Sequence, residues 1–276
     1  MVLLPHILPQ PALRPYVKYF MVLHIKLHDV PAHLRIKPYP PDADQMLYFY
    51  PRSEVKVIVN NNSDVRSSPS SIFVGQQTER INLQFGEDHL IIQACLQPGF
   101  LHLFLDKMPM KLFNSKELDA ESVGDTDMKF LNEQLQEETD YYRMVAHIEA
   151  YLLNKLKRKK IEYQPIDQVI DFVKNTEKAV SLDWLANQAC LSPRQFERKF
   201  QERMGVGPKF YARIVRFDKA FKMKLQQPHL DWLDVAYRCG YFDYAHMMRD
   251  FREFAEVTPS MLLAQDSVSP DKQRLW

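Results

Sequence analysis

The sequence predicts two domains: a β-rich amino-terminal domain with following helices, then an all-α carboxyl-terminal domain with two helix-turn-helix units joined by a connecting helix. Three observations predict this. Short β-branched and aromatic runs separated by turn residues fill roughly the first 115 positions. The apolar period becomes helical from Asp127 onward. The helical half also repeats itself at a fixed offset, which indicates two similar units.

Four runs in the amino-terminal region have strand character: residues 45–50, 55–59, 71–74 and 89–96. Turn clusters at 60–64 and 97–99 separate some of them. Short strands in this arrangement are typical of a small barrel or sandwich.

An amphipathic helix follows the β-rich region, because Val145, Ile148, Leu152 and Leu156 recur at spacings of three and four. This stripe either closes its own domain or forms a homodimer interface. A basic run at 155–160 and a helix start at Pro165 favour a boundary there. We therefore expect the first domain at 1–160, the second at 161–265 and a tail at 266–276.

Composition excludes several classes of protein. The 276 residues suit about two domains, and the mixture of 46% hydrophobic and 26% charged residues fits neither a disordered nor a fibrous chain. No apolar run approaches the roughly 20 residues that cross a bilayer, so we expect a soluble cytoplasmic protein without membrane contact. Cys95, Cys190 and Cys239 lack metal-ligand spacing, and we expect Cys190 and Cys239 to be buried where helices pack.

Enzyme signatures are missing from the sequence. It contains no P-loop, Rossmann fingerprint or Gly-x-Ser-x-Gly motif. His24, His28 and His33 lie near Asp29, yet their spacing does not suit a metal site. We expect no catalytic residue, no metal and no cofactor.

The repeat in the second half is offset first by 50 and then by 51 residues: Leu185 and Ala186 recur as Val235 and Ala236, Arg198 as Arg249, and Pro208 as Pro259. One extra residue therefore enters at the start of a helix in the second copy. Each copy reads as a helix, a tight turn and a second helix, at 182–188 with 192–203 and at 233–237 with 243–252. Ser192 and Gln195 form a capping box, and Asp243 caps the corresponding helix.

The second helix of such a unit places its amino-terminal residues at base edges in the major groove of DNA. With Phe196 and Phe200 inward, the first copy presents Ser192, Arg194, Gln195, Glu197, Arg198 and Lys199. An arginine side chain can donate hydrogen bonds to guanine, and a glutamate side chain can accept a hydrogen bond from cytosine. In the second copy we expect Phe242, Met247 and Phe251 inward, leaving Tyr244, Ala245, His246, Met248 and Arg249 outside, a face with fewer donors.

Charge differs between the copies. Residues 194–224 hold ten Lys or Arg against three acids, whereas residues 225–265 hold three against six. A basic block is typical of a phosphate-binding face and equally of a solvated helix surface. We predict that the first unit carries most of the DNA affinity.

Four motifs carry a family resemblance over about 100 residues: Ser181-Leu-x-x-Leu-Ala, Leu191-Ser-x-Arg-Gln-Phe-x-Arg-Lys-Phe200, Gly205-x-x-Pro-x-x-Tyr211, and Val235-Ala-x-x-x-Gly-Tyr-x-Asp-x-x-x-Met-x-Arg-x-Phe251. They resemble the DNA-binding domain of AraC/XylS-type transcription regulators. The resemblance implies that both recognition helices read adjacent major-groove segments, and it assigns base contact to Arg194, Glu197, Arg198, Tyr244, Ala245, His246 and Arg249. Two departures are Glu256, where the family has glycine, and Ala245, where it has a small polar residue.

The first domain resembles the cupin-like domains that precede such units, through residues 5–19, 39–42, 74–78 and 97–105. That resemblance implies small-molecule sensing or dimerisation. Tyr39, Tyr48, Tyr50, Phe73 and Phe85 are candidates for an apolar ligand pocket, and their alternative role is barrel core.

We therefore expect a DNA-binding transcription regulator controlled by a small-molecule effector or by a homodimer through Val145, Ile148, Leu152 and Leu156, with double-stranded DNA and RNA polymerase as candidate partners. The alternatives are a protein-interaction module that retains the fold but binds DNA weakly, and a cupin-type enzyme. Salt dependence separates DNA binding from protein pairing.

Overall fold

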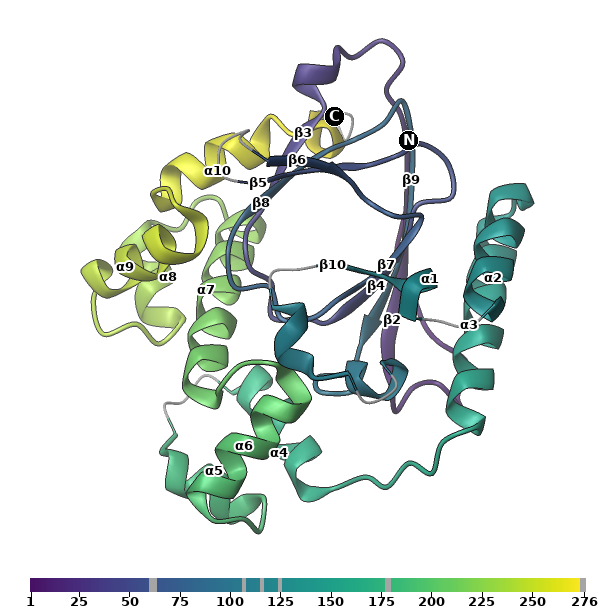
Figure 1. Cartoon of the computed structure of the whole chain (residues 1–276). Coiled ribbons are helices and arrows are strands. Elements are labelled where there is room, and N and C mark those ends of the chain that lie inside the picture. Colours follow the sequence, from purple (N-terminus) through teal and green to yellow (C-terminus); the bar gives the residue numbers. More distant parts are fainter. Residues whose placement is uncertain (60–63, 106–107, 115–116, 124–125, 177–179, 274–276) are drawn as a thin grey trace.

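The computed structural model describes the chain except residues 60–63, 106–107, 115–116, 124–125, 177–179 and 274–276. Two β-sheets enclose the centre of the molecule, and the first helices cover the outer side of one of them (Figure 1). The later helices curve around the opposite side, so that both halves of the chain are in contact.

Two antiparallel sheets form the amino-terminal domain. The larger has the order β1 (Val2–Ile7), β2 (Val17–Lys26), β9 (Asp88–Leu96), β4 (Met46–Phe49), β7 (Ser71–Val74) and β10 (Glu117–Asp119). The smaller has the order β3 (Ile36–Tyr39), β8 (Ile81–Gln84), β5 (Lys56–Val59) and β6 (Asp64–Ser67). The predicted β-rich first domain is confirmed.

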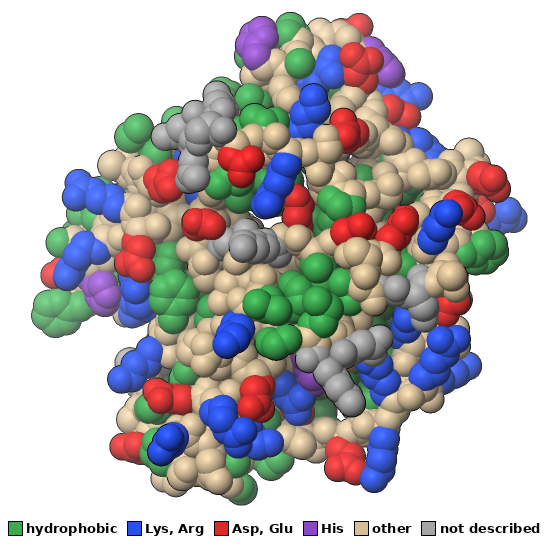
Figure 2. Space-filling model, in the orientation of Figure 1, with side chains coloured by type: hydrophobic (Ala, Val, Ile, Leu, Met, Phe, Trp, Pro, Cys, Tyr) green, Lys and Arg blue, Asp and Glu red, His purple; other side chains and the backbone are tan. Residues whose placement is uncertain are grey.

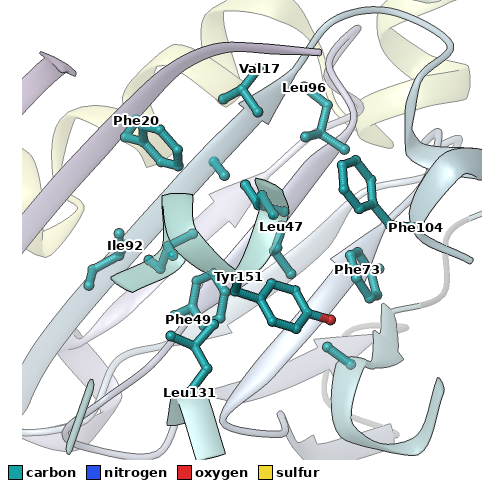
Figure 3. Close-up of a cluster of buried hydrophobic side chains, with 14 of the residues drawn as sticks. Val17, Phe20, Leu47, Phe49, Phe73, Ile92, Leu96, Phe104, Leu131 and Tyr151 are labelled. Atoms are coloured by element: carbon teal, nitrogen blue, oxygen red, sulfur yellow. The ribbon is translucent and has the colours of Figure 1, made fainter. Parts of the chain in front are cut away.

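The larger sheet is covered on both faces. Strand β9 shows this, since Leu90 and Ile92 belong to the core on one face while Ile91 belongs to the core between the sheets. Figure 3 shows the first of these cores, where sheet residues such as Phe49 and Phe73 face Leu131 and Tyr151 of two helices. These helices are α2 (Thr126–Glu137) and α3 (Tyr141–Lys157).

The apolar stripe of α3 lies inside its own domain. Val145, Ile148, Leu152 and Leu156 are at most 7% exposed and belong to the core against the larger sheet. The predicted homodimer interface through these four side chains is therefore wrong. An amphipathic period indicates that one face of a helix is buried, but not whether a second subunit or the same domain buries it. In this chain the larger sheet buries it.

The chain also turns between α2 and α3. Asp140 accepts a hydrogen bond from the Arg143 backbone N–H at 2.9 Å and so starts a new helix. Shorter helical segments precede this pair, at Ala32–Leu34 (η1), Leu101–Phe104 (η2), Met110–Phe113 (η3) and Ala120–Val123 (α1).

Eight helices follow in the described part of the second half: α4 (Pro165–Asn175), α5 (Leu182–Gln188), α6 (Pro193–Met204), α7 (Pro208–Gln226), α8 (Trp232–Arg238), α9 (Tyr244–Ala255), α10 (Pro259–Ser267) and α11 (Pro270–Gln273). Helices α5 and α6 form one helix-turn-helix unit, and α8 and α9 form the other. Helix α7 joins them, because Tyr211 and Val215 lie in the first core while Ile214 and Phe217 lie in the second. The predicted double unit is confirmed.

The two halves meet through the loop between β3 and β4. Ala43 of this loop is 3% exposed and belongs to the core of the first helix-turn-helix unit. The Tyr211 hydroxyl donates to the Ala43 carbonyl at 3.0 Å, and Lys222 pairs with Asp42 at 3.1 Å. The amino-terminal domain is thus fastened directly to α7.

The last described residues also return to the first domain, since Asp271 pairs with Lys37 of β3. The boundaries 1–160, 161–265 and 266–276 stay a prediction. None of the helices described by the structure has the length and apolar character needed to span a bilayer.

Replacing Leu152 by alanine tests the position of α3. Because Leu152 is fully buried, we expect the free energy of unfolding to fall by about 2–5 kcal/mol while the oligomeric state stays the same. Urea unfolding and sedimentation velocity measure these two quantities. Tyr142, 61% exposed on the same helix, is the matched control, and Tyr142→Ala should cost less than about 0.5 kcal/mol. A Leu152→Ala protein of unchanged stability that has lost a dimer would contradict this placement.

Candidate nucleic-acid interface

Helix α6 is built as the recognition helix that the sequence predicts. The Ser192 hydroxyl accepts from the Gln195 backbone N–H at 3.4 Å, and the Gln195 side-chain oxygen accepts from the Ser192 N–H at 3.1 Å. Phe196 and Phe200 are fully buried beneath the helix. The helix ends at Gly205, whose φ of +81° favours glycine and where a Cβ atom would clash with Asn114 and with the Met110 backbone.

The opposite side of α6 is open to solvent. Arg194, Gln195, Glu197 and Arg198 are exposed, and Lys199 is partly buried. Arg198 pairs with Glu202 one turn later at 3.2 Å, with both side chains more than half exposed. An exposed pair of this kind contributes little to stability, so Arg198 can exchange Glu202 for a DNA acceptor at small cost.

Several basic side chains of α7 bond to neighbouring parts of the protein and do not form the phosphate-binding face that a basic block can indicate. Arg213 pairs with Asp250 at 2.7 Å and with Glu253, and Arg216 pairs with Asp250 at 3.3 Å. Lys219 donates to the Thr176 carbonyl at 3.0 Å. These cations fasten α7 to its neighbours, so residues 194–224 do not form one continuous phosphate-binding face.

Helix α9 of the second unit also begins as predicted, because the Asp243 carboxylate accepts from the His246 N–H at 2.6 Å. Its outer face differs from that of α6. Tyr244, Ala245 and Arg249 are exposed, but Arg249 donates to the Ala245 carbonyl of its own helix at 3.4 Å. His246 is partly buried and lies 3.3 Å from the Arg216 guanidinium.

Phe242 contradicts the predicted inward set of α9. Met247 and Phe251 are fully buried as expected, whereas Phe242 is 85% exposed. The change of the repeat offset from 50 to 51 residues could have predicted this exposure. Tyr241 occupies the buried position before the helix, so the additional residue, Phe242, cannot also be buried there.

Cys190 contradicts another prediction. It is exposed and has φ +55°, the left-handed conformation that Gly240 adopts in the second unit with φ +76°. Cys239 is buried, as expected. A turn between two helices needs this backbone conformation, and the sequence pattern alone did not separate it from a packing position.

Glu256 shows what the missing family glycine does to the structure. It ends α9 in the left-handed conformation at φ +59°, which Gly205 supplies at the end of α6. A side chain there costs roughly 1 kcal/mol relative to glycine. The second unit keeps the same turn in spite of this cost.

Two family models match this chain: a helix-turn-helix domain at residues 185–265, and a domain of unknown function (DUF6597) at residues 5–119. The transcriptional regulator GbdR of Pseudomonas aeruginosa is 28% identical over 130 residues, which are 47% of this chain and 33% of GbdR. The transcriptional activator RhaS of Escherichia coli is 34% identical over 80 residues, which are 29% of this chain and 28% of RhaS. These matches agree with the resemblance of the carboxyl-terminal half to AraC/XylS-type regulators.

The helix-turn-helix model matches the carboxyl-terminal residues 185–265, and the chain spans about a third of the length of GbdR. Over the whole fold, the structure of ToxT from Vibrio cholerae covers 89% of this chain and 97% of its own at a TM-score of 0.50, with 14% identity. The two chains therefore share the overall fold.

The candidate pocket in the first domain is small. Tyr39, Tyr48 and Tyr50 line a cavity of about 50 Å³ between the sheets, beside Arg66 and Glu117. This volume has room for only one or two water molecules. Burial raises the pKa of Tyr48 and Tyr50 well above the usual value, so both hydroxyls stay neutral donors.

Two of the five predicted pocket residues lie elsewhere. Phe73 points from the other face of β7 into the core with α2 and α3 (Figure 3). Phe85 stacks on His89 with ring centroids 3.9 Å apart. Neither lines the cavity. Phe73 lies on the other face of the larger sheet, which is covered on both faces, whereas Phe85 lies in the core between the sheets without reaching the cavity.

His89 makes the stability of the barrel dependent on pH. It is 1% exposed, and burial lowers its pKa to about 3. The folded protein therefore keeps His89 neutral, whereas the unfolded chain binds a proton below about pH 6.5, so stability is lost as pH falls from 6.5 toward 3. We expect this residue to account for a loss of about 2 kcal/mol between pH 6.5 and pH 5.

Urea unfolding at neutral pH and at about pH 5 measures this dependence. We expect His89→Leu to have a shallower loss of stability than the wild type, with part of the slope retained because burial and then Arg203 lower the pKa of His102 to about 4. His33, exposed on η1, is the control, and His33→Leu should leave the slope unchanged. Equal slopes for His89→Leu and the wild type would refute this assignment.

Proposed function

We propose that this chain is a transcription regulator that binds duplex DNA through α6 and α9. The observation that carries the proposal is the pair of capped second helices, each with its amino-terminal end exposed and its apolar face buried in its own unit. In helix-turn-helix proteins these ends meet base edges in the major groove. We also propose a cytoplasmic location for the protein.

We assign the base-reading face of the first unit to Arg194, Glu197 and Arg198, with Ser192, Gln195 and Lys199 at the phosphates. For the second unit we assign Tyr244, Ala245, His246 and Arg249. Arg194 and Arg198 of α6 are exposed, and the Arg198–Glu202 pair is itself exposed, while His246 and Arg249 of α9 bond to Arg216 and to the helix backbone. The first unit should therefore contribute more of the affinity.

We propose that the amino-terminal domain controls DNA binding. A groove of about 860 Å³ supports this role, because Arg198, Gln201 and Glu202 of α6 line it together with Met110 and Lys111 of η3. A small effector would enter the tyrosine-lined cavity only if the sheets separated. Dimerisation would need a surface other than the buried stripe of α3, and RNA polymerase is a further proposed partner.

The second candidate function is a protein-interaction module. The acidic balance of residues 225–265 favours it, because acidic groups repel phosphates. Catalysis has no part in either proposal. Within the described ranges, no three His, Cys, Asp or Glu side chains come together as a metal site.

Fluorescence anisotropy on duplexes from upstream of the protein's own gene tests the proposal over a salt series. We expect saturable binding that weakens as salt is added, because bound cations release counterions from the phosphates. Arg194→Ala/Arg198→Ala should raise the Kd at least roughly 30-fold, since each arginine contact to a base contributes about 1–3 kcal/mol. His246→Ala/Arg249→Ala should raise the Kd less than about tenfold.

Lys56→Ala/Lys129→Ala is the control of equal charge loss, since both lysines are exposed on the first domain. It should bind DNA as the wild type does. Equal losses in the α6 and α9 variants would refute the unequal division of affinity. Binding that is absent at low salt would favour a protein that needs its effector or a protein-interaction module, and repeating the measurement with metabolite mixtures separates these two.

A further inference from the structure

Phe242 is the most exposed of the large hydrophobic side chains in the described part of the chain, at 85%. It lies one residue before Asp243, the cap of the second recognition helix. The amino-terminal end of such a helix is the part that approaches the bases. A phenyl ring in this position meets water in the free protein and DNA in a complex.

The structure shows why this ring points outward. Tyr241, the preceding residue, is 3% exposed, and the Arg216 guanidinium lies 4.4 Å from its ring centroid. The next residue, Asp243, is held by the bond from the His246 N–H. In the first unit Leu191 leads directly to the cap Ser192, so Phe242 is an addition to the recognition end of the second unit alone.

Next to Phe242 the chain presents an apolar methyl group and an aromatic ring, since Ala245 is exposed and Tyr244 is 39% exposed. Two nearby basic side chains each use one nitrogen within the protein: Arg249 Nε donates to the Ala245 carbonyl, and His246 Nε2 lies 3.3 Å from the Arg216 guanidinium. Figure 2 shows hydrophobic side chains beside a histidine at the left edge of the molecule, with basic and acidic side chains among them. This end of the unit can offer apolar contact more readily than hydrogen bonds.

The major groove has one apolar group that distinguishes a base, the C5 methyl group of thymine. We propose that the second unit recognises thymine by apolar contact of Phe242, with Ala245 beside it, whereas the first unit reads its segment by hydrogen bonds from α6. This inference rests on the proposed function. A protein partner seated on Phe242 is the competing outcome.

The test replaces thymine by uracil, which removes only the methyl group. Wild-type protein first selects its site from duplexes with about 25 random base pairs, long enough for two major-groove segments. The selected site is then made with uracil in either segment. We expect uracil in the α9 segment to raise the Kd roughly fourfold for each methyl group contacted, and uracil in the α6 segment to have little effect.

Phe242→Ala should bind the thymine site more weakly than the wild type and should no longer distinguish thymine from uracil in the α9 segment. Its melting temperature should stay unchanged, because the ring is exposed in the folded protein. Tyr237, 59% exposed on α8, is the matched aromatic control, and Tyr237→Ala should keep the thymine preference.

Uracil bound as tightly as thymine, or a thymine preference retained by Phe242→Ala, would overturn the inference and favour a protein partner at this ring. The proposed function would still stand if Arg194→Ala/Arg198→Ala abolished binding to the same site. Failure of the wild type to enrich any sequence from the pool would overturn both.

Discussion

The loop between β3 and β4 ties the two halves of the molecule together. It inserts Ala43 into the core of the first helix-turn-helix unit and places Asp44 against Lys174 of α4, where both side chains are buried. Burial lowers the pKa of Lys174 to about 7, with Lys18 as a further cause. Removing one partner from a buried pair costs about 3–5 kcal/mol. The position of α4 and α7 relative to the barrel depends on this contact.

Helix α7 carries the constraint from the loop to the second unit. Near its start, Tyr211 bonds the loop, and two and five residues later Arg213 and Arg216 pair with Asp250 of α9, which is 1% exposed. Both recognition helices therefore pack on the same helix. A displacement of the loop that moved α7 would carry α6 and α9 together.

Features that depend on residues close together in the sequence could be predicted, whereas features that depend on contacts between distant segments could not. Caps such as Ser192 and Asp243 act within four residues, and the helix starts they predict are correct. The predictions that the α3 stripe forms a dimer interface and that Phe73 lines a pocket were wrong. An alternating or helical period indicates that one face is buried, but it does not indicate which element buries that face. The exposure of Phe242 could be predicted only by knowing which residue of the turn is the additional one. That depends on the packing of Tyr241, which the sequence does not show.

The two units differ in how they can hold DNA. Helix α6 presents the exposed Arg194 and Arg198 at its amino-terminal end, whereas at the corresponding end of α9 the partly buried His246 lies beside Arg216, and Phe242 is exposed. Dimeric helix-turn-helix proteins read palindromes because two identical units are related by a two-fold axis. Two unlike units joined by α7 have no such axis. The DNA they read together would then be asymmetric, and one copy of the chain would define the direction in which it lies.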